Sequence, residues 1–231
     1  MTSGEPVARA LVALYDFVAG QQTFEETLTR IVTVTTESLA ANVGGITMLD
    51  QGQRAATVGS NDPLVGEIDE AQYQPDAGPC LEAMRSGRVV RTDDLRTDDR
   101  WPEFARAATA HGILSTLSLP LIADGRSEGA LNIYAARTRA FGEAAEEFGQ
   151  AFANQAVIGI SYWKQATVAE HLRRALESRG QIEQAKGILM ATTGCSADEA
   201  FDLLRQQSQN ENRKLRDVAI DLIAQQSRHR S

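Results

Sequence analysis

Residues able to contact a charged polymer gather near the C-terminus of the chain. Lys186 stands between Ala185 and Gly187, whose small side chains leave the backbone beside the ammonium group open. A lysine in this setting can reach phosphates or unpaired bases, although an ordinary solvated helix lysine is the simpler alternative. Further cations follow at the end of a second predicted helix and in the turn after it. We predict a nucleic-acid contact surface made of Gln184, Lys186, Gly187, Arg205, Asn212, Arg213 and Lys214.

Cys80 is a second residue whose chemistry depends on its surroundings. It follows Gly78-Pro79 at the start of a predicted helix, where a thiolate is favoured, so a redox-sensing thiol and a small packed side chain both remain open.

His111 has no second histidine in its predicted domain, and helix capping explains the aspartates Asp93, Asp94, Asp98 and Asp99. The chain has no P-loop, nucleophile elbow or HExxH motif. We therefore expect no metal site and no enzyme activity.

The periodicity of the tail predicts three short helical segments that position these residues. The first ends at Thr192-Thr193-Gly194 and carries one apolar face made of Leu172, Leu176, Ile182, Ala185 and Leu189. Ser196 and Glu199 fit a capping box that opens the second, whose inner face is Ala200, Leu203 and Leu204. We expect Asn212 to cap a third helix that buries Leu215, Val218, Ala219, Leu222 and Ile223. Three helices of this size enclose a small core and leave no room for an enzyme pocket.

This tail resembles the ANTAR domain, a three-helix RNA-binding module of bacterial transcription antitermination regulators. The resemblance covers about the last quarter of the chain and rests on Ala185-Lys186-Gly187 with Leu189-Met190, on Ala200-Phe201 with Leu204-Arg205, and on Asn212, Leu215 and Ala219. It implies binding of paired small RNA hairpins in a nascent transcript, in the proximity of RNA polymerase, so that a terminator cannot form. Phe201 either stacks on a base or fills the helical core, and we expect the core.

The charge of the chain is unevenly distributed between its two parts. Residues 1–170 hold 13 Lys and Arg against 23 Asp and Glu, whereas residues 171–231 hold 10 against 8. The overall charge of −8 therefore belongs to the first part, and the tail is weakly basic. Such a weak excess gives little nonspecific binding to phosphates, while recognition of RNA loops through stacking and base edges needs less charge.

The first part of the chain predicts an α+β domain with a mostly antiparallel sheet. The expected elements, in chain order, are helices over Val7–Phe17 and after Thr23, strands over 44–49 and 54–59, helices over 62–69 and 81–86, a strand from Val89, a helix over 98–110, and strands over 113–122 and 129–135. A long helix from about Glu143 towards Glu177 follows without a flexible linker.

The residues of this domain resemble a GAF domain of the actinobacterial subgroup that precedes ANTAR domains. The resemblance rests on Asp69 with Gln72-Tyr73, Gly78-Pro79-Cys80, Asp94-Leu95, Arg100-Trp101-Pro102 with Phe104, Gly112, Ser115, Leu119-Pro120-Leu121 and Gly129-Ala130-Leu131-Asn132 with Tyr134. GAF folds are ligand-sensing modules, so it implies a small-molecule pocket whose ligand is unknown and which requires no cofactor. The pocket residues that we expect are Tyr73, Cys80, Trp101, Ser115 and Tyr134, although Trp101 and Tyr73 can also belong to a hydrophobic core. Cys80 is the only cysteine in this domain, which argues against the methionine-sulfoxide reductase activity of some GAF proteins.

The long helix also predicts a homodimer. An imperfect coiled-coil seam follows three- and four-residue steps along Phe148, Phe152, Gln155, Gly159, Tyr162, Ala166, Ala169 and Leu172.

We expect a GAF sensor domain over residues 1–160, a connecting coiled-coil helix over 161–175 and an ANTAR domain over 176–231. No apolar run is long enough for a transmembrane helix, the N-terminus lacks the pattern of a signal peptide, and the two cysteines are far apart. The expected location is therefore cytoplasmic.

The function expected from these features is that of a cytoplasmic, dimeric RNA-binding antitermination regulator. Two alternatives from other classes remain open. The last three helices could act as a DNA-binding helix–turn–helix, or the tail could serve only to dimerise a GAF signalling module.

Overall fold

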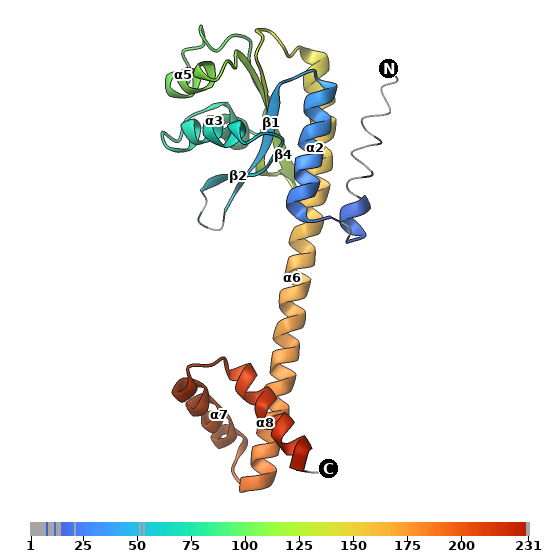
Figure 1. Cartoon of the computed structure of the whole chain (residues 1–231), viewed down its shortest axis with the longest axis vertical. Helices are drawn as coiled ribbons and strands as arrows, with labels where there is room; N and C mark the ends of the chain where they lie inside the picture. Colours follow the sequence, from blue (N-terminus) through green and yellow to red (C-terminus); the bar gives the residue numbers. More distant parts are fainter. Residues whose placement is uncertain are drawn as a thin grey trace. The chain divides into compact units, whose positions relative to one another are not determined.

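The computed structural model describes residues 8, 12, 15–20, 22–50, 52 and 54–229. The chain divides into two units, Met1–Lys164 and Gln165–Ser231. One helix, α6 (Glu143–Thr193), is 51 residues long and contributes to both (Figure 1). The helix predicted over Val7–Phe17 lies mostly outside the described residues. None of the helices in the described part of the chain combines the length and the apolar character that crossing a bilayer requires.

The first unit is built on a five-stranded antiparallel sheet. Its strands have the order β2-β1-β5-β4-β3. They are β1 (Val43–Leu49), β2 (Ala55–Ser60), β3 (Val90–Thr92), β4 (Ser115–Ala123) and β5 (Arg126–Ala135). Every neighbouring pair is antiparallel. The predicted α+β class with an antiparallel sheet is confirmed.

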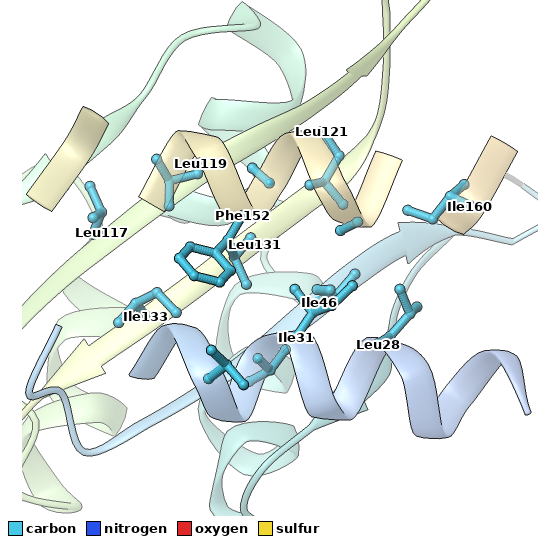
Figure 2. Packing of buried hydrophobic residues seen from close by; sticks show 14 of the residues in the cluster. Leu28, Ile31, Ile46, Leu117, Leu119, Leu121, Leu131, Ile133, Phe152 and Ile160 are labelled. Carbon is cyan, nitrogen blue, oxygen red and sulfur yellow. The ribbon is translucent and has the colours of Figure 1, made fainter. Parts of the chain in front are cut away.

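Helices cover both faces of this sheet (Figure 1). On one face lie α2 (Phe24–Ser38) and the first part of α6, and on the other lie α3 (Leu64–Tyr73), α4 (Pro79–Ser86) and α5 (Pro102–Ala110). Figure 2 shows the apolar core on the first face, whose labelled members are Leu28, Ile31, Ile46, Leu117, Leu119, Leu121, Leu131, Ile133, Phe152 and Ile160. The leucines of β4 reach this core because alternate residues of a strand point to the same face.

Local capping explains where two of the helices begin. The Thr23 hydroxyl accepts the N–H of Glu26, and the Glu26 carboxylate accepts the N–H of Thr23, which forms a capping box at the start of α2. Ser196 and Glu199 form the same arrangement at the start of α7 (Ala197–Glu211). The capping box at Ser196 and the start of α2 after Thr23 both agree with the sequence prediction.

The first half of the predicted coiled-coil seam is used inside the chain itself. Phe152 is fully buried in the core of the sheet, its ring lies 5.0 Å from that of Phe148, and Gln155 is only 8% exposed. Side chains that the chain's own sheet covers cannot also contact a second copy. The prediction that this part of α6 forms the dimer seam is therefore wrong. Its apolar face packs on the sheet of the first unit instead.

The second unit packs α7 and α8 (Leu215–His229) against the last part of α6 (Figure 1). Its core consists of Ala185, Leu204, Val218 and Ala219. Two expectations are wrong here. Leu203 is 45% exposed, because Ala200 and Leu204 alone form the buried face of α7. Asn212 ends α7 rather than opening the third helix: it adopts a left-handed conformation (φ 50°), which asparagine tolerates, and its N–H bonds back to Gln209 and Ser208.

The burial of Phe152 makes a stability prediction. We expect Phe152→Ala to lower the free energy of unfolding by about 3–5 kcal/mol, because it removes a fully buried ring and leaves a cavity. Ile158→Ala, on the same helix at a position that is 58% exposed, serves as the control and should cost less than about 1 kcal/mol. Urea unfolding of both variants measures the difference. Equal losses would show that Phe152 is not part of the core.

Candidate functional site

A buried carboxyl group lies between α3 and the sheet. Asp69 is fully buried, and four side chains donate hydrogen bonds to its oxygens. The donors are Tyr134, Thr57 (2.7 Å), Gln72 (3.2 Å) and Tyr73 (3.4 Å). We call this group, together with Thr47 and Asn132, the Asp69 network. Thr47 bonds to the Tyr73 hydroxyl at 2.8 Å and accepts the amide of Asn132 at 3.0 Å. The network fastens α3 to three strands of the sheet.

Burial sets the protonation of this network. It raises the pKa of Asp69, because a charge removed from water is disfavoured, while the four donors act in the opposite direction. Burial and the nearby Asp69 also raise the pKa of Tyr73 and of Tyr134. Both hydroxyl groups therefore remain protonated at neutral pH and available as donors. The donors that surround Asp69 are therefore neutral hydroxyl and amide groups.

Cys80 lies at the edge of the network, near the start of α4. Its backbone N–H donates to Gln72 at 3.0 Å, and its side chain packs with Leu81, Met84 and Ala130. Gly78 is required beside it, since a Cβ there would lie 2.3 Å from the side chain of Gln72. Burial, together with the nearby Asp69, raises the pKa of the Cys80 thiol to about 12. The structure thus favours the small packed thiol over the redox-sensing thiolate.

Three buried polar atoms near this network have no hydrogen-bond partner. They are the hydroxyl groups of Thr116 and Ser118 and the carbonyl oxygen of Asn132, all on residues that are fully buried. Ser118 and Asn132 lie directly opposite each other on β4 and β5, and Thr116 pairs with Tyr134. Each unpaired buried group costs about 1–3 kcal/mol, so these atoms favour a small polar partner at this face of the sheet. Sequence reasoning missed Thr116 and Ser118, although their alternation with the leucines of β4 could have indicated them.

The structure brings together three of the five predicted pocket residues. Tyr73 and Tyr134 belong to the Asp69 network, and Cys80 adjoins it. Trp101 is 6% exposed, packs with Phe104 and Tyr134, and carries the Arg100 guanidinium 4.2 Å from its ring centre. Ser115 does not join the group. It pairs with Ala135, which packs under α2 and α6, so it faces the opposite side of the sheet and donates to the Arg137 carbonyl at 2.7 Å.

Two aspartates between β3 and α5, Asp94 and Asp98, bind side chains close to them in sequence. The Arg96 side chain binds Asp94, and it holds the pKa of that carboxyl at about 2. Asp98 accepts hydrogen bonds from Arg100 and from Thr92 (2.9 Å). Among the described residues, no group of three or more potential ligands has the arrangement of a metal site.

The second unit exposes a cation and an aromatic ring on α7. Phe201 is 38% exposed, which corrects its expected place in the core, and Arg205 lies one turn after it. Arg205 pairs with Asp202 at 3.3 Å, and Lys186 of α6 pairs with Glu183 at 3.0 Å. The Arg205 pair is exposed on both sides and contributes little energy, so Arg205 can exchange its carboxylate for a phosphate. The Lys186 side chain is only 16% exposed, so neighbouring side chains restrict its position.

The other predicted contact residues have separate surroundings. Arg213 binds the carboxylates of Glu211 (3.0 Å) and Asp221 (2.6 Å), so it joins the turn to α8. Asn212 holds the end of α7, and Lys214 is exposed beside it. Arg205 pairs with Asp202 within its own helix rather than with residues 212–214. Their role in binding stays a prediction.

Gln184 and Gly187 lie on a different face of α6 from Lys186. They line a groove of about 290 Å³ with Ile188, Ala191 and Thr192 of the same helix and Ile223 and Gln226 of α8. Lys186 is two residues after Gln184, and so lies about 200° around the helix from it. The structure therefore divides the predicted contact residues of α6 between two faces. Sequence reasoning missed the α8 side of this groove.

The environment of Cys80 makes a prediction about thiol reactivity. In the native protein we expect Ellman's reagent to titrate one thiol quickly, that of the half-buried Cys195, because Cys80 is fully buried and protonated. In denaturant both should react. The control is Cys195→Ser, in which Cys80 is the only remaining thiol. In the native variant this thiol should react at least about a hundredfold more slowly than in the denatured variant. Rapid native labelling of that variant would support the redox-sensing thiol.

Comparisons with known proteins agree with this architecture. A GAF domain model matches residues 21–161, and an ANTAR domain model matches residues 170–223. No curated protein sequence matches the chain. Solved structures share the fold of the first unit at low identity. A free methionine-R-sulfoxide reductase from Neisseria meningitidis is 17% identical with a TM-score of 0.55, and 71% of this chain and 93% of that chain are covered.

Two further structures are GAF domains of phosphoenolpyruvate-protein phosphotransferases. The one from Coxiella burnetii is 15% identical with a TM-score of 0.54, and 73% of this chain and 99% of that chain are covered. The one from Acinetobacter is 16% identical with a TM-score of 0.51, covering 70% and 95%. At these identities the likeness shows the fold alone. The GAF domain model matches more than half of the chain, so the chain belongs to the GAF domain family, and an ANTAR domain follows its GAF domain.

Proposed function

We propose that this protein is a cytoplasmic regulator that binds paired RNA hairpins in nascent transcripts and so prevents terminators from forming. The observation that carries the proposal is the ANTAR match over residues 170–223, on a three-helix unit that presents Lys186, Phe201 and Arg205. An exposed aromatic ring can stack on an unpaired base, and a cation one turn away can bind the phosphate beside it.

The GAF domain supplies the sensing part of the proposal. GAF and ANTAR domains are regulatory modules, and one of the solved structures that share the GAF fold is an enzyme, a methionine-R-sulfoxide reductase. Cys80 is buried and protonated here, which argues against thiol catalysis at that position. The unpaired groups of Thr116, Ser118 and Asn132 favour a small polar ligand that would satisfy them.

A direct test is selection from a library of transcripts that carry two stem-loops with randomised loops. We expect the full-length protein to enrich particular loops and to bind them more tightly than a duplex DNA of the same sequence at one salt concentration. Lys186→Met and Arg205→Gln should each weaken binding by about tenfold or more, because each removes a charged contact, and thermal unfolding should change little. Arg106→Gln, which changes an exposed cation of α5, is the matched control.

Other results would support the alternatives. Equally tight and equally salt-dependent binding to RNA and duplex DNA would point to a DNA-binding regulator or to nonspecific electrostatics. No nucleic-acid binding at all would point to a GAF signalling module whose tail serves another purpose. A loss of folded protein that matches the loss of binding would make Lys186 and Arg205 structural residues.

Paired hairpins require two ANTAR domains, so the proposal includes a homodimer. Val168, Leu172 and Leu176 follow one another at four-residue steps on α6 and are 65%, 60% and 61% exposed. Intrahelical pairs of Arg173 with Glu170 and Glu177, and of Arg174 with Glu170, balance the charge next to them. A nearly neutral flank allows two copies of this face to approach without repulsion. The apolar stripe of the second unit is therefore the contact that we assign to the dimer.

Charge insertion tests this contact. We expect Leu172→Glu with Leu176→Glu to convert a dimer into a monomer in analytical ultracentrifugation, because the change places carboxylates in an apolar contact. Thr167→Glu with Ser178→Glu adds the same charges to the far side of the helix and should leave the dimer intact. A dimer that persists with the first pair of changes would place the contact elsewhere.

A further inference from the structure

The groove between α6 and α8 has the size and the lining of a site for one planar group. Its volume of about 290 Å³ lies at the lower end of the range for small-molecule pockets, so it fits a single heteroaromatic ring better than a larger ligand. Ile188 and Ile223 supply apolar side chains on the two helices. A flat ring placed against them would lose little hydration, because its faces are apolar.

Two amide side chains give the groove its hydrogen-bonding capacity. Gln184 comes from α6 and Gln226 from α8. Each carries a carbonyl acceptor and an NH2 donor, which match the alternating donors and acceptors along the edge of a nucleobase. An aliphatic ligand has no such edge and would leave these amides in water. The lining therefore favours a nucleobase over a purely apolar group.

Gly187 keeps the groove open. A Cβ at this position would have no heavy atom within 4 Å, so any side chain added here would extend into free space. Glycine inside a helix costs about 1 kcal/mol relative to alanine. Gly180 has the same open surroundings but does not line the groove. The two glycines thus differ in whether they line the groove.

The charge of the lining distinguishes a base from a phosphate. Of the described residues that line the groove, none is charged, so the groove offers a phosphate no charged partner. Phosphate contacts position a nucleic acid, and base contacts specify its sequence.

We propose that this groove receives one unpaired base of a bound RNA loop and that Gln184 and Gln226 read its edge. The inference rests on the proposed RNA binding and adds a specificity site to it, on a different face from Phe201 and Arg205. The occupant is an unstacked nucleobase of a stem-loop, held by the two amides and by the apolar walls of the groove.

A double-mutant cycle between the protein and the RNA tests this site. The probe is a stem-loop transcript selected by the wild-type protein from the randomised library, with each loop nucleotide replaced in turn by an abasic one. For the wild type we expect one abasic position to weaken binding about tenfold or more. In Gln184→Ala with Gln226→Ala, and separately in Gly187→Leu, the intact RNA should bind about tenfold more weakly. In these variants the same abasic replacement should weaken RNA binding by no more than about twofold.

Matched controls separate the groove from the stability of the helix. Gly180→Leu makes the same change in helix propensity away from the groove, and Gln225→Ala removes an exposed amide next to Gln226. Both should keep the wild-type affinity and the full abasic penalty. Groove variants that do the same would overturn the inference while the RNA-binding function stands. If the wild type enriches no RNA from the library, the proposed function and this inference both fail.

Discussion

The two-residue period of β4 and β5 is the constraint on which the GAF domain depends. It sends Leu117, Leu119 and Leu121 to the face that α2 and α6 cover, and it sends Thr116 and Ser118 to the face that α4 covers. A shift of one residue would exchange the two sets and would place hydroxyl groups in the apolar core. The separation of a packing face from a polar face follows from this register.

The polar face is held by hydrogen bonds rather than by packing alone. Asp69 gathers hydroxyl and amide donors from α3, β2 and β5, so one carboxyl group fastens a helix to the sheet. The cost of burying that group is offset because four donors satisfy its oxygens. The satisfied hydrogen bonds around Asp69 define a single arrangement of its donors. The Asn132 carbonyl oxygen at the edge of the network and the hydroxyl groups of Thr116 and Ser118 beside it are unpaired, and a polar ligand would bind there.

The ANTAR domain achieves its fold with much smaller side chains. Its fully buried core is made of Ala185, Leu204, Val218 and Ala219, and the larger side chains around it are only partly buried. A small core leaves a large share of each helix exposed, and this exposure is what allows three helices to present distinct surfaces. Phe201 and Arg205 lie on one, the groove with Gln184 and Gln226 forms another, and Val168, Leu172 and Leu176 form a third.

The sequence alone was sufficient to predict the main helices and strands and to identify the resemblance to the two domain families. Capping boxes at Thr23 and Ser196, the alternation of β4 and the three- and four-residue steps of α6 are local patterns, and local patterns are what hydrogen-bonding geometry and side-chain spacing encode. Tertiary structure decided which neighbour each face meets. A periodic apolar stripe such as that of Phe148 and Phe152 looks the same whether it packs on its own sheet or on a second copy. Ser115 and Thr116 are adjacent in sequence, yet strand pairing sends them to opposite faces. The partners of Asp69 and the α8 side of the groove come from segments far apart in the chain, so only the folded structure brings them together.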